Sequence, residues 1–424
     1  MQRRNFTLIV LFAMILGAGA GYWLHANTPE SDWPTYVGYF STVTDLFIRL
    51  IRMIIAPLVL TTLIVGIAHM GGGSALGRVG ARTLGWFISA SLVSLLLGLA
   101  IVHILQPGVG LGLPLPASTE SSGVQASALN MHDFITHLVP RSIFEAMANN
   151  EILQIVVFSA FFGAALATLG EDAKPVIELT EKVSHVMLRV VGYVMWVAPF
   201  AVFAAIASTV GEHGLGILVT YARFIGGFYL ALIVLWTLLI TFGLIIVGPR
   251  VLGLIGMMRE PMLVAFSTAS SEAAYPRTFE QLQHWGVSRR IAGFVLPLGY
   301  SFNLDGSMMY CTFAVIFIAQ AYGIELSWIQ QVSMLLLLMV TSKGMAGVPR
   351  ASLVVIAATL TAFGLPEAGL VLILAVDHFL DMGRSATNVV GNSIATAIVA
   401  KWENELGARK AVVAPAPNLA AETE

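Results

Sequence analysis

The chain has 424 residues, of which 57% are hydrophobic and only 11% are charged, and its mean hydropathy is +0.83. Soluble domains contain about 25% charged residues, so this composition excludes an ordinary soluble protein and predicts an integral membrane protein. The net charge of -2 gives no basis for nucleic-acid binding. Because Cys311 is the only cysteine and the nine histidines are scattered, no disulfide and no transition-metal site is expected.

Apolar runs between Gly, Pro and charged residues predict an all-α membrane protein with eight spanning helices. The expected ranges are 5–26, 39–69, 77–106, 133–169, 175–210, 216–248, 286–321 and 367–402. The fourth range is interrupted by polar stretches and is expected to form several short helices. Segments 251–283 and 328–362 are apolar but cut in the middle by Ser, Gly and Pro, which predicts two re-entrant helical hairpins.

The distribution of basic residues predicts the orientation. The loops expected outside, around 27–38, 107–131, 211–215, 322–327 and 363–366, contain no Lys or Arg. The opposite loops and the two ends carry Arg3, Arg4, Arg78, Arg82, Lys174, Lys182, Arg250, Arg259, Arg277, Arg289, Arg290, Lys401, Arg409 and Lys410. The positive-inside rule therefore predicts a multi-pass protein with both termini in the cytoplasm. The polar, Ala/Pro-rich tail at 411–424 is expected to be disordered.

A pattern occurs twice in the last third of the chain. "AFSTASSEAAYPRTFE" gives a polar hairpin tip followed by a helix interrupted at "GYSFNLDGSMMY". "TSKGMAGVPRASLVV" gives a second tip followed by the helix that carries "DHFLDMGRSATNVVGN". Matched interruptions in two halves of a membrane protein indicate a binding site of a secondary transporter near the bilayer midplane.

Five polar residues lie on one face of the last helix. Asp377, Asp381, Arg384, Asn388 and Asn392 are spaced by 4, 3, 4 and 4 residues. A guanidinium, a carboxylate that accepts an ammonium, and an amide suit a zwitterion with an acidic side chain. The alternative is an Asp381–Arg384 pair that only neutralises itself within the bundle.

The stretch "NLDG" predicts a cation site. Asn303, Asp305 and Gly306 inside an apolar run favour local unwinding, and the freed carbonyls together with the Asp305 carboxylate can replace a cation's hydration shell. The alternative is that Asp305 only caps a helix fragment.

Taken together, these motifs resemble those of the dicarboxylate/amino acid:cation symporters, also called the glutamate transporter family. "SSEAAYP", "NLDGS", "GMAGVP" and "DMGRSATNVVGN" carry the resemblance, which extends to about Lys401. It implies eight transmembrane helices and two hairpins in an inverted-repeat elevator transporter, a homotrimer in the bacterial inner membrane. Residues 1–410 would form one domain, with scaffold helices near 5–69 and 133–210 and a transport part near 77–106 and 216–402.

The resemblance also implies a role for individual residues. Arg384 would bind the substrate's side-chain carboxylate, and Asp381 with Ser385 would hold its ammonium. The remaining substrate contacts would come from Ser270, Ser271, Ser307, Val348, Ser352 and Asn388. Oxygen ligands for a coupling cation would come from Gly299, Ser301, Asn303, Asp305, Ser342, Met345, Asn388 and Asn392.

Several positions depart from the family pattern. Asn392 stands where sodium-coupled relatives carry a carboxylate, which predicts weaker cation binding. Cys311 replaces a glutamate that carries a proton in some relatives, and Ala90 stands where a hydroxyl ligand is expected. Glu272 replaces a serine at the first tip, so it is the candidate proton carrier unless it points into cytoplasmic water. Arg350 either reaches the substrate or lies in extracellular water.

The sequence therefore predicts a symporter of acidic amino acids, L-glutamate or L-aspartate, coupled to protons, sodium ions or both. It is expected to be no enzyme and to need no cofactor, with its substrate, the lipid bilayer and its own copies as partners. A C4-dicarboxylate symporter is the alternative. A channel or sensor is disfavoured because the polar groups of both charge signs converge on one site.

Overall fold

The computed structural model describes residues 3–68, 73–110, 139–213, 221–342, 351–374 and 376–407. Within these ranges the regular structure is helical, and the one β-type contact is an isolated bridge between Val287 and Leu406. The helices are α1 (Arg3–Asn27), η1 (Glu30–Asp32), α2 (Trp33–Ala68), α3 (Gly73–Leu105), α5 (Ile143–Ala148), α6 (Ile152–Leu169), η2 (Gly170–Ala173), α7 (Lys174–Val194), α8 (Ala198–His213), α10 (Ala222–Val247), α11 (Arg250–Met257), α12 (Arg259–Thr268), η3 (Glu272–Ala274), α13 (Tyr275–Trp285), α14 (Arg289–Phe302), α15 (Asp305–Ala321), α16 (Trp328–Thr341), α17 (Ala351–Ala362), η5 (Glu367–Gly369), α18 (Leu370–Leu374) and α19 (Asp377–Trp402).

Six helical segments of the described chain are long and apolar enough to cross a bilayer, and the bent pair α11–α12 makes a seventh. These segments confirm an all-helical, multi-pass membrane protein. Helix α19 is not among them although it has 26 residues. Its charged side chains lower its hydropathy, but they contact protein rather than lipid, so hydropathy alone does not detect it.

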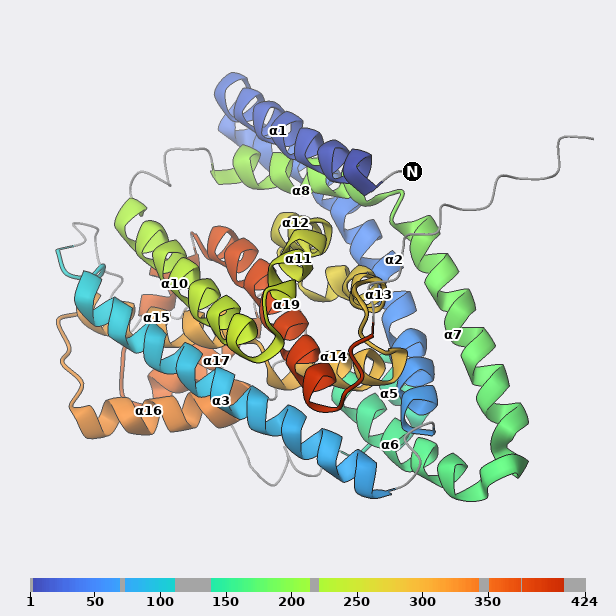
Figure 1. Ribbon diagram of the computed structural model, residues 1–424. Coiled ribbons are helices and arrows are strands. Elements are labelled where there is room, and N and C mark those ends of the chain that lie inside the picture. Colours follow the sequence, from blue (N-terminus) through green and yellow to red (C-terminus); the bar gives the residue numbers. More distant parts are fainter. Residues whose placement is uncertain are drawn as a thin grey trace, which may run out of the picture.

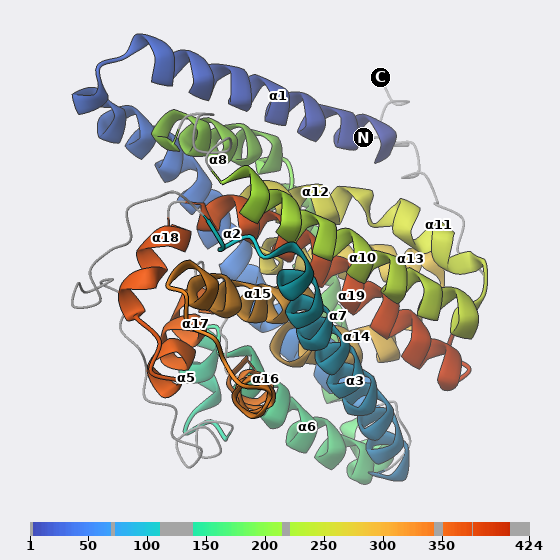
Figure 2. The same cartoon turned by 90° about the vertical axis from the view of Figure 1, so that its left-hand side faces the viewer.

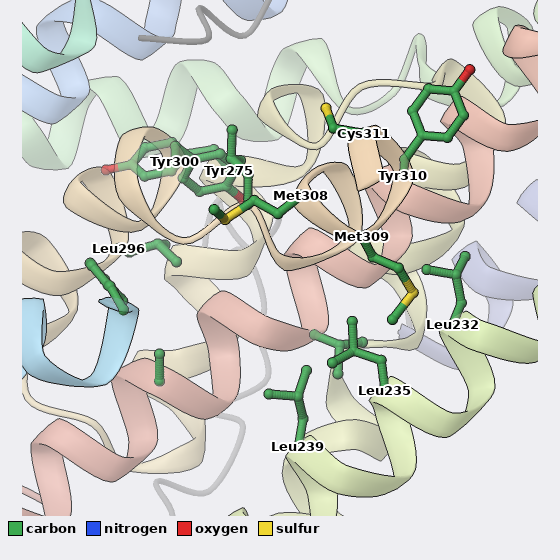
Figure 3. Packing of buried hydrophobic residues seen from close by; sticks show 14 of the residues in the cluster. Leu232, Leu235, Leu239, Tyr275, Leu296, Tyr300, Met308, Met309, Tyr310 and Cys311 are labelled. Atoms are coloured by element: carbon green, nitrogen blue, oxygen red, sulfur yellow. The ribbon is translucent and has the colours of Figure 1, made fainter. Parts of the chain in front are cut away.

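Helix α19 lies in the middle of the bundle, packed against α10, α12, α14 and α15 (Figures 1 and 2). Every residue from Leu380 to Ala400 is buried. Apolar side chains of the neighbouring helices fill the space around it, and Figure 3 shows leucines of α10 close to Met309 of α15. A helix buried on all sides must satisfy its polar groups with protein partners, which places a strict requirement on its polar face.

Helices α1 and α8 cross one end of the bundle, as Figure 2 shows. They approach closely because Gly17 and Gly21 of α1 lie against backbone carbonyls of α8, where a Cβ would come within 2.5 Å of Phe203 O and 2.6 Å of Ala207 O. The prediction of one continuous helix over 175–210 is wrong. The segment is divided into α7 and α8 by a turn at 195–197, and Pro199 at the second position of α8 favours a new helix start there.

The predicted interruption at "NLDG" is confirmed. Helix α14 ends at Phe302 and α15 begins at Asp305, with Asn303 and Leu304 in non-helical conformations between them. At the first predicted tip, α12 ends at Thr268, and Ala269 has a φ of 49° that reverses the chain toward η3 and α13. The second tip, at 343–350, lies outside the described residues, as does the tail at 411–424.

Candidate functional site

The predicted pair on α19 is present and buried. Arg384 donates from Nε to Asp381 Oδ1 over 2.6 Å, and the two residues are 6% and 2% exposed. Ser385 donates its hydroxyl to the same carboxylate oxygen over 3.2 Å. One helical turn thus holds a guanidinium and a carboxylate side by side, away from lipid and bulk water.

Neighbouring helices complete the surroundings of the guanidinium. Nη1 of Arg384 donates to Ser352 of α17 and, over 3.4 Å, to Ser307 of α15. The ring of Tyr310 lies 5.8 Å from the guanidinium carbon, within cation–π range. The Tyr310 hydroxyl donates to Asp377 Oδ1 over 2.8 Å. The negative charge of Asp377, on the same face of α19 as Asp381, also attracts the guanidinium of Arg384.

Asn388 joins α19 to the start of α15. Its side-chain oxygen accepts from Gly306 N over 2.9 Å and from Ser307 N over 3.4 Å, and its amide donates to Ser307 Oγ over 3.0 Å. Glycine is required at 306 because a Cβ there would lie 2.5 Å from Arg384 O. Asn388 therefore binds first-turn amides of α15 and fixes Ser307 beside the guanidinium.

A second polar cluster lies one turn further along α19. Asn303 Nδ2 donates to Asp305 Oδ2 over 3.0 Å and to Asn392 Oδ1 over 3.2 Å, and Ser94 of α3 donates to Asp305 Oδ1 over 3.4 Å. All four side chains are at most 1% exposed. Two glycines permit this approach: a Cβ on Gly299 would lie 2.2 Å from Asn392 Oδ1, and one on Gly391 would lie 2.0 Å from Asp305 Oδ2.

The donor set of this cluster fits a small hard cation. Asp305 provides a carboxylate, and the side-chain oxygen of Asn303 has no hydrogen-bond partner among the described residues. Oxygen ligands of this kind suit sodium rather than a transition metal, and among the described residues no group of three or more His, Cys, Asp and Glu is placed to hold a metal ion. Because Asn392 contributes an amide, the cluster holds one carboxylate.

The first hairpin tip lies apart from these contacts. Ser270 and Ser271 are half-buried, and Ser270 Oγ accepts from Ala273 N over 3.3 Å, so this bond stays within the tip. Helix α12 packs along α19, and Ala269 at the tip belongs to one apolar cluster with Met382 of α19. Glu272 is half-buried in η3, which contacts α2, and the charge of Arg52 in α2 acts on it.

The other predicted residues are distributed as follows. Gly299 and Ser301 lie in α14 and Ser301 is buried, while the buried Ser342 donates its hydroxyl to Met339 O over 3.3 Å. Met345, Val348 and Arg350 lie outside the described residues.

Sequence reasoning missed two contributors. Ser94, one helical turn after Ala90, donates its hydroxyl to Asp305, and Tyr310 links Asp377 to Arg384. For Ser94 no local signal in α3 selects it over Ser91, whereas Tyr310 is indicated only by its place in the turn after Ser307.

A buried guanidinium beside a carboxylate on one helix, flanked by a helix interrupted at an acidic residue, is the arrangement of a membrane transporter. The chain belongs to the sodium:dicarboxylate symporter family, whose model matches residues 6–402. It is therefore a symporter rather than an enzyme.

Relatives with different substrates in their names match almost the whole chain. The "C4-dicarboxylate transport protein" of Cupriavidus necator is 41% identical over 95% of this chain and 92% of its own. The "Proton/glutamate-aspartate symporter" of Escherichia coli is 41% identical, over 97% and 96%. The "Proton/sodium-glutamate symport protein" of Bacillus subtilis is 38% identical over the same shares.

Proposed function

We propose that this symporter takes up acidic amino acids, L-glutamate or L-aspartate, together with protons, sodium ions or both. The buried Asp381–Arg384 pair carries the proposal. A neighbouring carboxylate and guanidinium match an acidic amino acid, which offers an ammonium to one and a carboxylate to the other. Arg384 would bind the side-chain carboxylate, and Asp381 with Ser385 would accept the ammonium.

The remaining substrate contacts follow from the same assignment. Asn388 and the tip serines Ser270 and Ser271 would bind the α-carboxylate. Ser307 and Ser352 would complete the pocket, since both already contact the guanidinium. Val348 of the second tip is proposed for the same pocket by family resemblance.

Transport of C4-dicarboxylates is the second candidate, and the name of the Cupriavidus relative favours it. A dicarboxylate uses Arg384 and the α-carboxylate subsite equally well. It has no ammonium for Asp381, and this is the physical reason for placing amino acids first.

Coupling is proposed to involve both the buried cluster and the first tip. Sodium would bind at Asp305 and Asn303, with Gly299, Ser301, Asn388, Asn392, Ser342 and Met345 contributing oxygens. Because Asn392 contributes an amide, the cluster has one carboxylate and should bind sodium weakly. We therefore expect sodium to supply a smaller part of the driving force for uptake. Protons would be carried by Glu272, whose position beside Arg52 also suits a fixed ion pair.

The family resemblance further supports eight spanning helices with two re-entrant hairpins, a homotrimer in the inner membrane with cytoplasmic termini, and an elevator movement. Helices near 5–69 and 133–210 would form the scaffold and the remainder the transport part. Cross-linking of single-cysteine variants in native membranes tests both the trimer and the movement.

Uptake by purified protein in liposomes tests the substrate and the ions. Labelled L-glutamate and L-aspartate are supplied outside, and sodium and pH gradients are imposed separately. Uptake driven by either gradient supports the proposal. Arg384→Gln should reduce uptake at least hundredfold, because the substrate carboxylate loses a buried, charged partner worth roughly 3 kcal/mol. Normal accumulation by this variant would refute the assignment.

The Glu272→Gln variant isolates the proton pathway. If Glu272 carries the proton, a pH gradient alone no longer drives uptake in this variant, while any sodium-driven component persists. Undiminished pH-driven uptake would show that Glu272 is not the carrier. Competition by malate and succinate then ranks the two substrate classes.

A further inference from the structure

One oxygen of Asp381 is shared between two donors. Asp381 Oδ1 accepts from Arg384 Nε over 2.6 Å and from the Ser385 hydroxyl over 3.2 Å, at 2% exposure of the residue. Arg384 is equally committed, since its Nε is bonded to Asp381 and its Nη1 to hydroxyls of α15 and α17. A substrate carboxylate that binds Nε together with Nη2, which has no such bond among the described residues, competes with Asp381 for Nε.

That competition leaves a buried anion behind. When a substrate carboxylate takes over the guanidinium, Asp381 loses its charged partner in a site with almost no access to water. An uncompensated buried carboxylate is strongly unfavourable and is relieved either by a cation or by a proton. The ammonium of an amino acid is such a cation, and it arrives on the same molecule.

The titratable groups near Asp381 in the described part of the chain come from α19 and its neighbouring helices. On α19 the titratable neighbours are Arg384, Asp377 and the half-buried His378, and Asp377 adds negative charge. From α10 the neighbour is Tyr229 and from α15 it is Tyr310, both neutral in their ordinary state, whereas Cys311 of α15 lies near Arg384 and Asp377. Hydroxyls of Ser307, Ser352 and Ser385 donate hydrogen bonds but no charge. Among the described residues, Arg384 is thus the cation paired with Asp381.

We infer that Asp381 exchanges partners during binding, and that a substrate without an ammonium brings one additional proton on the Asp381 carboxylate. This rests on the proposed function. The proton comes from the water on the side of loading, forms the O–H bond of Asp381, and is released to water on the opposite side when the substrate leaves. Asp381 thereby sets both the preference for amino acids and the number of protons moved with each substrate.

L-aspartate, malate and succinate form a matched series for the test. They share a four-carbon dicarboxylate skeleton and carry an ammonium, a hydroxyl and a hydrogen at one carbon. L-aspartate has a net charge of -1 at neutral pH, whereas malate and succinate have -2. Succinate with one additional proton therefore moves the same net charge as L-aspartate.

Equilibrium accumulation by wild-type protein in liposomes measures the proton number. The pH gradient and the membrane potential are set independently, above the pH at which the dicarboxylates are doubly charged. A gradient of one pH unit should raise the accumulation ratio of succinate and malate about tenfold more than that of L-aspartate. The membrane potential should act equally on all three.

Two results would refute the inference on Asp381, and a third would refute the proposed function. An equal response of L-aspartate and succinate to the pH gradient overturns the inference. So does exclusion of succinate and malate at every pH while L-aspartate accumulates. If neither class accumulates under any gradient, the proposed function itself fails.

The Asp381→Asn variant adds an independent readout, with Asp45→Asn on the exposed face of α2 as the matched control. A neutral amide needs no proton, so the variant should move one proton fewer with each succinate than the wild type does. Its succinate accumulation should therefore depend less steeply on the pH gradient. Uptake of L-aspartate should fall at least tenfold, because its ammonium loses the carboxylate. An unchanged proton number for succinate in an active variant contradicts the exchange.

Discussion

Gly391 of α19, the helix that carries the proposed substrate site, offers a direct way to disturb the buried cluster. A Cβ at this position would lie 2.0 Å from Asp305 Oδ2. An ordinary carbon–oxygen contact is more than an ångström longer, so in Gly391→Ala the carboxylate must turn away. Asp305 is held by Asn303 over 3.0 Å and by Ser94 over 3.4 Å, and turning disrupts both contacts.

The magnitude follows from these two losses. A hydrogen bond to a charged group contributes about 1.5–3 kcal/mol, so losing two at the lower end costs about 3 kcal/mol. A total near 3 kcal/mol corresponds to roughly a hundredfold weaker binding of a cation at the cluster. In the proposed site this appears as a hundredfold higher cation concentration for half-maximal uptake.

The assay measures substrate uptake against sodium concentration and against pH, together with thermal unfolding of the purified protein. Gly226→Ala is the matched control, because a Cβ on this helical glycine of α10 meets nothing within 4 Å. The control should keep wild-type uptake and gain slightly in stability, since alanine favours helix. Wild-type cation dependence in a folded Gly391→Ala protein would refute the assignment of the cluster.

Two further changes test the contacts around the site and at the end of α19. Tyr310→Phe keeps the ring beside Arg384 but removes the hydroxyl that donates to Asp377, so KM for substrate should rise about tenfold with a smaller change in kcat, as steady-state uptake would reveal. Glu403→Gln removes the partner of Arg78 and Arg82 of α3, which are 54% and 39% exposed at their side chains. Because the Glu403 side chain itself is only 2% exposed, its pairs are worth more than a surface salt bridge, about 1.5–3 kcal/mol, and the melting temperature should fall by a few degrees.

Local sequence features sufficed for much of the fold. Composition identified a membrane protein, and the polar residues of "NLDG" identified the break between α14 and α15. The spacing on α19 placed Asp381 and Arg384 on one face, because a helix fixes that relation within a single turn. These features depend on residues close in the chain.

Contacts between distant segments were harder to foresee. Ser94 reaches Asp305 across 211 residues, and nothing in the local pattern of α3 selects it over Ser91. The division of α7 from α8 was missed because the apolar run continues through the turn, so only Pro199 indicates the break. Such contacts and helix breaks depend on how distant segments pack together, and the sequence of one segment alone does not reveal this packing.

The two polar clusters are connected by a very short path, and this bears on how ion and substrate binding influence each other. Asp305 belongs to the buried cluster, and Ser307, two residues later in α15, contacts both Arg384 and Asn388. Asn388 also holds the backbone of Gly306 between them. Any change that turns Asp305 therefore moves the first turn of α15, which positions a hydroxyl at the guanidinium. A coupling free energy requires two sites that bias one common element, and with the proposed ion and substrate sites that element is the first turn of α15.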